Sequence, residues 1–96
     1  MTVYVDSARN THGRMMMSHM LCLPRDVADL HAMALRIGLR REWFQANFIP
    51  HYDVSQSKRA LAIEQGAQTI DRRAVEVLIR EWRAARTDSN AQGGAC

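Results

Sequence analysis

The chain has 96 residues, which is room for one domain with a single modest hydrophobic core. Its composition, 47% hydrophobic and 24% charged, is typical of a folded soluble domain, and no apolar run approaches the roughly 20 residues of a membrane span, so we expect no membrane partner. The net charge of +3 permits binding of a polyanion but is too small an excess to identify a nucleic-acid-binding protein.

The N-terminus and the two cysteines favour a reducing compartment. The first residues lack the basic start and apolar stretch of a secretory signal, which predicts a cytoplasmic protein. Cys22 lies in an apolar run and Cys96 ends the chain, so we expect no disulfide framework, although oxidation of Cys96 would cross-link two chains. The sequence sets no oligomeric state.

Two strands and a helix are predicted first. Thr2–Val5 is β-branched and aromatic, as in a short strand, and a polar loop follows. Met15–Leu23 is apolar on both faces, which favours a strand covered on each side, while its length also allows a buried helix. Asp26 is then expected to cap a helix that runs to about Ile37, with Gly38 ending it.

The second half is predicted to hold two more helices. A short turn or strand is expected around Glu42–Phe44, and Ser55 or Ser57 can cap a helix that closes at Gly66. A short strand follows before Asp71, which is expected to cap a third helix lying across the sheet.

The predicted fold is α/β: a small sheet of three or four strands, at least partly parallel, packed with about three helices. We expect residues 1–86 to form this single domain and residues 87–96 to form a flexible tail, because the tail has little apolar surface to bury. Ligands of such sheets gather beyond the carboxyl ends of the strands. That rule places Asp6 near the 51–59 segment.

The richest chemistry lies between His51 and the second helix. His51 and Asp53 project to the same side of an extended chain, where the carboxylate could orient the imidazole or both could hold a metal. Together with Asp6 and His19 they would form a nitrogen and oxygen ligand set for Mg²⁺, Mn²⁺ or Zn²⁺. The plainer interpretation is that Asp53 stabilises a turn or cap and His51 bonds to backbone.

A candidate anion site follows at the start of the second helix. A hydroxyl, free backbone N–H groups and positive charge can converge on a phosphate at Ser57, Lys58 and Arg59, with Arg9 and Arg14 completing the site. The alternative is a capped and solvated first turn. No Walker-type glycine loop is present, which argues against a nucleoside triphosphate site.

Aromatic and methionine side chains offer two further possibilities. Trp43 and Tyr52 could stack a nucleic-acid base, although burial in the core is the commoner role of such residues. The run Met15–Met17 is most simply flexible core filling, but exposed methionines would form an adaptable surface for a protein partner.

Short blocks of sequence within residues 1–73 are similar to those of one family. They are Val3–Asp6, Gly13–Met15, His19–Met20, Leu30–Ala34, Ile37–Gly38, Trp43–Gln45, His51–Asp53 and Ser57–Ala60. On these blocks the chain resembles the domain of unknown function 4031 family, small uncharacterised proteins of bacteria and their phages. The resemblance implies no catalytic residues, because the family has no assigned activity.

Two functions from different classes follow. The first is binding of a phosphate-bearing ligand, either a phosphorylated small molecule such as a nucleotide or a nucleic-acid phosphate. Phosphoester hydrolysis would then use His51 as general acid or base, with Asp53 or Asp6 orienting it or holding a divalent metal. The alternative is a non-enzymatic protein-interaction module, such as a phage-borne modulator of a host protein. The sequence leaves open whether the protein is an enzyme.

Overall fold

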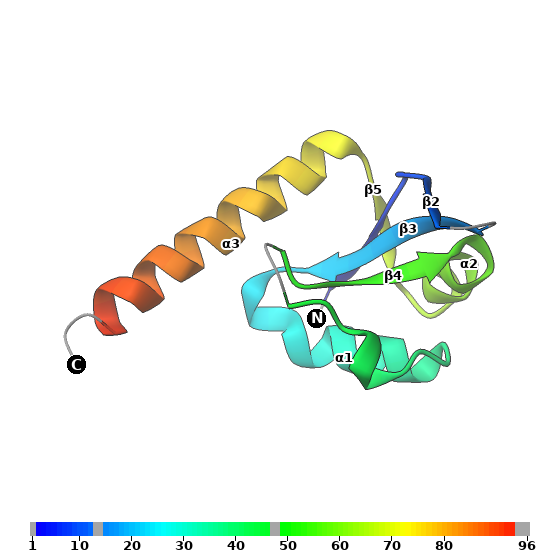
Figure 1. Cartoon of the computed structure of the whole chain (residues 1–96), viewed down its shortest axis with the longest axis horizontal. Helices are drawn as coiled ribbons and strands as arrows, with labels where there is room; N and C mark the ends of the chain where they lie inside the picture. Colours follow the sequence, from blue (N-terminus) through cyan, green and yellow to red (C-terminus); the bar gives the residue numbers. More distant parts are fainter. Residues whose placement is uncertain (1, 13–14, 47–48, 94–96) are drawn as a thin grey trace.

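The computed structural model describes residues 2–12, 15–46 and 49–93, and within them the chain forms one mixed α/β sheet domain (Figure 1). The strands are β1 (Val3–Asp6), β2 (Asn10–His12), β3 (Met15–Cys22), β4 (His51–Ser55) and β5 (Gln68–Ile70). The α-helices are α1 (Val27–Arg36), α2 (Gln56–Glu64) and α3 (Arg72–Gly93), and the 3-10 helices are η1 (Pro24–Asp26) and η2 (Arg41–Trp43). The predicted α/β class is confirmed.

The long strand β3 organises the sheet. It pairs antiparallel with β4 along one edge, and with β1 and then β2 along the other. β1 and β5 pair in parallel, which confirms the prediction of a partly parallel sheet. The short β2 lies where the sequence indicated only a polar loop.

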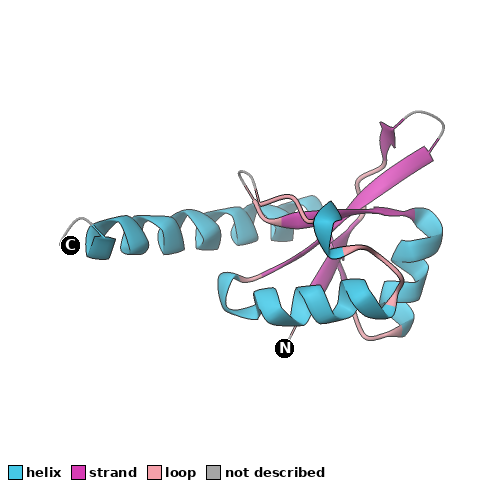
Figure 2. Ribbon diagram, turned by 60° about the horizontal axis from the view of Figure 1, so that its bottom comes forward, coloured by secondary structure: helices cyan, strands magenta, loops and turns pink. Residues whose placement is uncertain are grey.

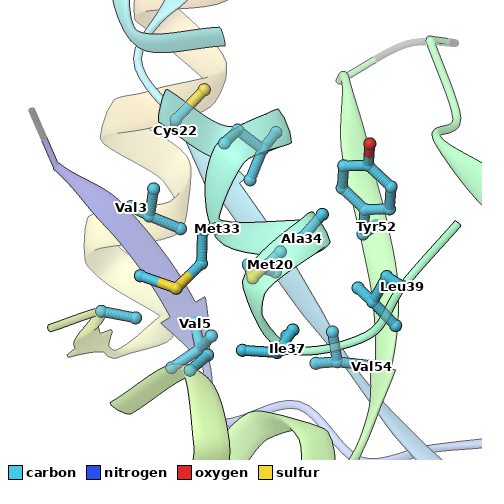
Figure 3. Close-up of a cluster of buried hydrophobic side chains, with 13 residues drawn as sticks. Val3, Val5, Met20, Cys22, Met33, Ala34, Ile37, Leu39, Tyr52 and Val54 are labelled. Carbon is cyan, nitrogen blue, oxygen red and sulfur yellow. The ribbon is translucent and has the colours of Figure 1, made fainter. Parts of the chain in front are cut away.

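The hydrophobic core lies on one face of this sheet. Val5, Met20 and Tyr52 occupy neighbouring strands in register, and each is fully buried. Figure 3 shows them beside α1, and Met33 of α1 and Ile37 just after it complete the cluster. Because side chains alternate along a strand, the residues between them project from the opposite face.

The helices lie on both sides of the sheet. α1 and α3 are on opposite sides, and α3 extends well past the strands, as Figures 1 and 2 both show. α3 is fixed to the sheet by Trp82, whose indole N–H donates to the carbonyl oxygen of Cys22 at 2.8 Å. No helix of the described residues is both long enough and apolar enough to cross a membrane.

The predicted helix ends are largely confirmed. Ser55 Oγ accepts the backbone N–H of Lys58 at 3.3 Å, and Asp71 Oδ1 accepts that of Ala74 at 2.9 Å. Gly38 follows α1 with a φ of +87°, a left-handed conformation that suits glycine. α3 continues to Gly93, so its backbone is helical beyond residue 86, and the flexibility of the tail stays a prediction.

A further strand was not predicted, and one pair of alternatives is decided. His51–Ser55, expected only as an extended stretch before the second helix, is strand β4, because Tyr52 and Val54 alternate into the core while the polar residues face away. Of the turn or strand predicted around Glu42–Phe44, the turn is confirmed, since Glu42 lies in η2, a single 3-10 turn. Extended pairing comes later, where Gln45 and His51 form an isolated bridge.

Candidate metal centre

Two neighbouring strands place three potential metal ligands on the face opposite the core. His19 is on β3, and His51 and Asp53 are on β4. The strands are in register so that His19 lies directly opposite Asp53, with His51 diagonal to it. Cross-strand neighbours in such positions are close enough for their side chains to meet.

The ligand atoms converge on one point. One ligand atom from each of the three residues lies within 4.8 Å of the other two. Asp53 Oδ1 is 3.4 Å from Nε2 of His51 and 3.9 Å from Nε2 of His19. Ligand atoms around a tetrahedral zinc ion are separated by about 3.3 Å, as expected from bonds of about 2 Å. The three atoms therefore need little adjustment to share an ion.

The other nitrogen of each imidazole is held by a second group. Nδ1 of His19 lies 2.7 Å from Asp6 Oδ2, and Nδ1 of His51 donates to the carbonyl oxygen of Ile49 at 2.7 Å. A proton on each Nδ1 leaves the Nε2 lone pair facing the cluster, which is how metal-ligating histidines are commonly oriented. Backbone and carboxylate thus fix both rings.

Asp53 is held in the same way. Its Oδ2 accepts a hydrogen bond from the side-chain amide of Gln45 at 2.6 Å, which leaves Oδ1 for the cluster. Sequence reasoning missed Gln45, because it lies in an irregular segment before β4. The available signal was its place in the Trp43–Gln45 block that carries the family resemblance.

Asp6 lies behind His19. Both its oxygens face that residue: Oδ2 meets Nδ1, and Oδ1 accepts the backbone N–H of His19 at 2.8 Å. Burial raises the pKa of Asp6, but the hydrogen bonds from the side chain and backbone of His19 outweigh it, so the pKa lies below its usual value. The bond from Asp6 raises the pKa of His19 against the effect of burial. Asp6 is therefore an ionised group that orients His19.

The cluster borders two cavities. A cavity of about 340 Å³ lies beside His19 and His51 and has aliphatic walls that include Val75 and Ile79 of α3. A second cavity, of about 600 Å³, is also lined by Asp53. The side chains of His19, His51 and Asp53 are 35%, 20% and 22% exposed, so a ligand can reach the cluster.

Lys58 and Arg59, two cations of the predicted anion site, bond to carbonyl oxygens in different parts of the fold. Lys58 Nζ donates to the carbonyl oxygen of Ile37 at 2.7 Å, and Arg59 Nε donates to that of Asp6 at 2.8 Å. Ser57 is exposed. Lys58 and Arg59 thus attach α2 to the end of α1 and to β1, and they do not converge on one anion together with Ser57.

The structure gives no support for the two loop arginines of the predicted anion site. Arg9 is exposed, and Arg14 lies outside the described residues. Of the residues predicted from the sequence, the structure brings together Asp6, His19, His51 and Asp53.

Comparison with known proteins agrees with the resemblance. The family model described as "Protein of unknown function (DUF4031)" matches residues 3–82, which include every residue of the cluster. Neither the curated proteins nor the solved structures contain a match to this chain. On the strength of the family match over most of its length, the chain belongs to the DUF4031 family.

Proposed function

We propose that this protein binds a divalent transition metal through His19, His51 and Asp53 and hydrolyses a phosphoester bond there. The proposal rests on one observation. Three ligand atoms face one another, while the remaining nitrogen or oxygen of each side chain is held by a separate group. A merely structural hydrogen-bond cluster has no need to keep three acceptor atoms together.

The ligand types favour one kind of ion. Of the three ions that the sequence suggested, Mg²⁺ prefers an all-oxygen shell, whereas two imidazoles with one carboxylate suit Zn²⁺. Catalytic zinc sites characteristically have three protein ligands and keep one position open for water or substrate. The cluster of His19, His51 and Asp53 matches that number.

The chemistry divides between the ion and the chain. A bound Zn²⁺ would lower the pKa of a coordinated water and hold a phosphate oxygen. In hydrolysis the water oxygen forms a new bond to phosphorus, the ester bond breaks, the attacking water releases a proton to solvent, and the leaving oxygen takes one up. His19 and Asp53 contribute by fixing the ligand geometry before substrate arrives.

The role of His51 changes in this proposal. Its Nδ1 is engaged by Ile49, so its Nε2 cannot both bind a metal and transfer protons. We assign His51 to the metal instead of the general acid or base role that its sequence context suggested. Asp6 becomes a positioning residue, since both its oxygens are used on His19.

Metal binding is tested first. Chelator-treated protein is titrated with Zn²⁺, Mn²⁺ and Mg²⁺ by calorimetry, and we expect one Zn²⁺ per chain. His51→Ala and Asp53→Asn should each lower the Zn²⁺ affinity at least tenfold. The matched control is His31→Asn, since His31 bonds to Tyr52 on the core side and should leave affinity unchanged.

Hydrolysis is tested on the loaded protein. Zinc-dependent release of nitrophenol from p-nitrophenyl phosphate or its diester should disappear in His51→Ala, with folding checked by circular dichroism. Zinc binding without hydrolysis would reject the reaction but keep the site. Failure to bind any of the three metals would reject both and favour the interaction module, for which Met15 and Met16, 53% and 41% exposed, offer a surface.

A further inference from the structure

The cavity that reaches Asp53 has the lining of a site for a flat, weakly polar group. Its volume of about 600 Å³ lies within the range of small-molecule sites. Its lining combines apolar with polar and charged side chains: Met15, Met17, Leu39, Trp43 and Phe44 with Glu42, Gln45, Asp53, Ser55 and Lys58. The aromatic and thioether groups in this lining suit an aromatic ring better than a sugar, whose hydroxyls need many polar partners.

Trp43 is the main reason for this interpretation. Its side chain is 50% exposed at the end of η2, and the guanidinium of Arg40 lies 6.0 Å from the ring centre. The other tryptophan, Trp82, has a structural role, since its N–H bonds to the Cys22 carbonyl oxygen. Tyr52, the other predicted stacking residue, is fully buried. Trp43 therefore has an exposed indole that can stack on a ligand.

The cavity and the metal centre are continuous through two residues. Asp53 lines the cavity, and its Oδ1 lies beside Nε2 of both His19 and His51. Gln45 lines the cavity beside it and donates its amide N–H to Asp53 Oδ2, so its amide carbonyl oxygen can accept a hydrogen bond from a ligand. Because Asp53 and Trp43 line the same cavity, a ligand that extends from the ion into this cavity can contact Trp43.

We propose that this cavity binds the base of a nucleoside phosphate, stacked on Trp43, while the phosphate lies at the metal centre. The inference rests on the proposed function and names its class of substrate. Lys58 also lines the cavity, although its Nζ donates to the carbonyl oxygen of Ile37. A free mononucleotide and the end of a single strand present the same chemistry, and the test distinguishes them.

The test compares ligands with and without a base. Zinc-loaded protein is titrated by calorimetry with AMP, ribose 5-phosphate and inorganic phosphate. We expect AMP to bind at least fivefold more tightly than ribose 5-phosphate, since stacking on one aromatic side chain is worth roughly 5- to 150-fold in affinity. In a Trp82→Phe background, AMP should also quench the remaining fluorescence of Trp43.

Trp43→Leu should reduce the AMP affinity to that of ribose 5-phosphate, leaving Zn²⁺ affinity unchanged. The matched control is Val77→Ala, because Val77 is also 50% exposed but lies on α3 outside this cavity. Tighter binding of a dinucleotide than of AMP would identify a strand end as the ligand, and equal binding would identify the mononucleotide.

Two failures are distinguishable. Equal affinities for AMP and ribose 5-phosphate, or an unchanged AMP affinity in Trp43→Leu, would overturn the base site while the metal centre stands. Absence of Zn²⁺ binding in the separate metal titration would instead overturn the proposed function, and the base site with it.

Discussion

The two faces of the sheet are built from the same strands, but one face forms the hydrophobic core and the other carries the candidate metal ligands. On β4, Tyr52 and Val54 point into the core and are fully buried, whereas His51 and Asp53 point the other way and stay partly exposed. β3 divides in the same manner between Met20 and its neighbour His19. Alternation thus lets one segment stabilise the fold with every second residue and leaves the others free for chemistry.

The largest effect is expected from breaking the core face. Met20→Ala should lower the free energy of unfolding by about 2–5 kcal/mol, because Met20 is fully buried and its removal leaves a cavity. Denaturant unfolding measures this. The control is Leu35→Ala on α1, where the side chain is 77% exposed and a change within about 0.5 kcal/mol is expected. A similar loss in both variants would contradict the placement of the core.

The next largest effect is expected at Asp6, which holds the ligand His19 on the face that carries the candidate metal centre. Asp6→Asn should lower Zn²⁺ affinity about 10- to 100-fold, because an amide cannot hold His19 as an ionised carboxylate does. Calorimetric titration measures it, with Asp29→Asn on α1 as the control. If Asp6→Asn bound zinc as tightly as the unchanged protein, Asp6 would have no positioning role.

A smaller effect is the pH dependence of stability that arises from His31, the histidine on the core side of the sheet. Burial, followed by the positive charge of Arg41, lowers the pKa of His31 below its usual value of 6.5. The unfolded chain therefore takes up a proton first as the pH falls, so stability from neutral His31 is present above pH 6.5 and is lost below it.

This pH dependence can be isolated by substitution. The free energy of unfolding of His31→Asn should fall less between pH 7 and pH 5 than that of the unchanged protein, as measured in metal-free buffer. Identical slopes for the two proteins would show that His31 titrates alike in the folded and unfolded states.

The smallest effect is expected at Cys22, whose thiol should react slowly with alkylating reagents in the folded protein. Cys22 is fully buried on the core face, and burial raises its pKa to about 12, so little thiolate is available to react. In a Cys96→Ser variant, iodoacetamide at pH 8 should label the folded protein far more slowly than the denatured protein, as followed by mass spectrometry. Equally rapid labelling of both would contradict the burial of Cys22.

Sequence alone predicted the fold class and most helix ends, because residue type and local spacing carry that information. It also suggested Asp6, His19, His51 and Asp53 as a ligand set, but only the strand pairing of the tertiary fold brings these residues together. It did not reveal β4, since three of its five residues are polar and resemble a loop. Nor did it show where Lys58 and Arg59 point. Their carbonyl partners lie 21 and 53 residues away in the chain, and only the tertiary fold decides such contacts.

The junction of β4 and α2 has a consequence for how the site responds to unfolding. β4 ends at Ser55, which is also the N-cap of α2, so no linker separates the ligand-bearing strand from the helix. The same strand is joined to Gln45 at its other end. Folding alone thus places His51 and Asp53. An ion bound to them would stabilise the folded strand β4 and, through Ser55, the start of α2. Unfolding of β4 would then separate His51 and Asp53 from His19 and remove the N-cap of α2 together.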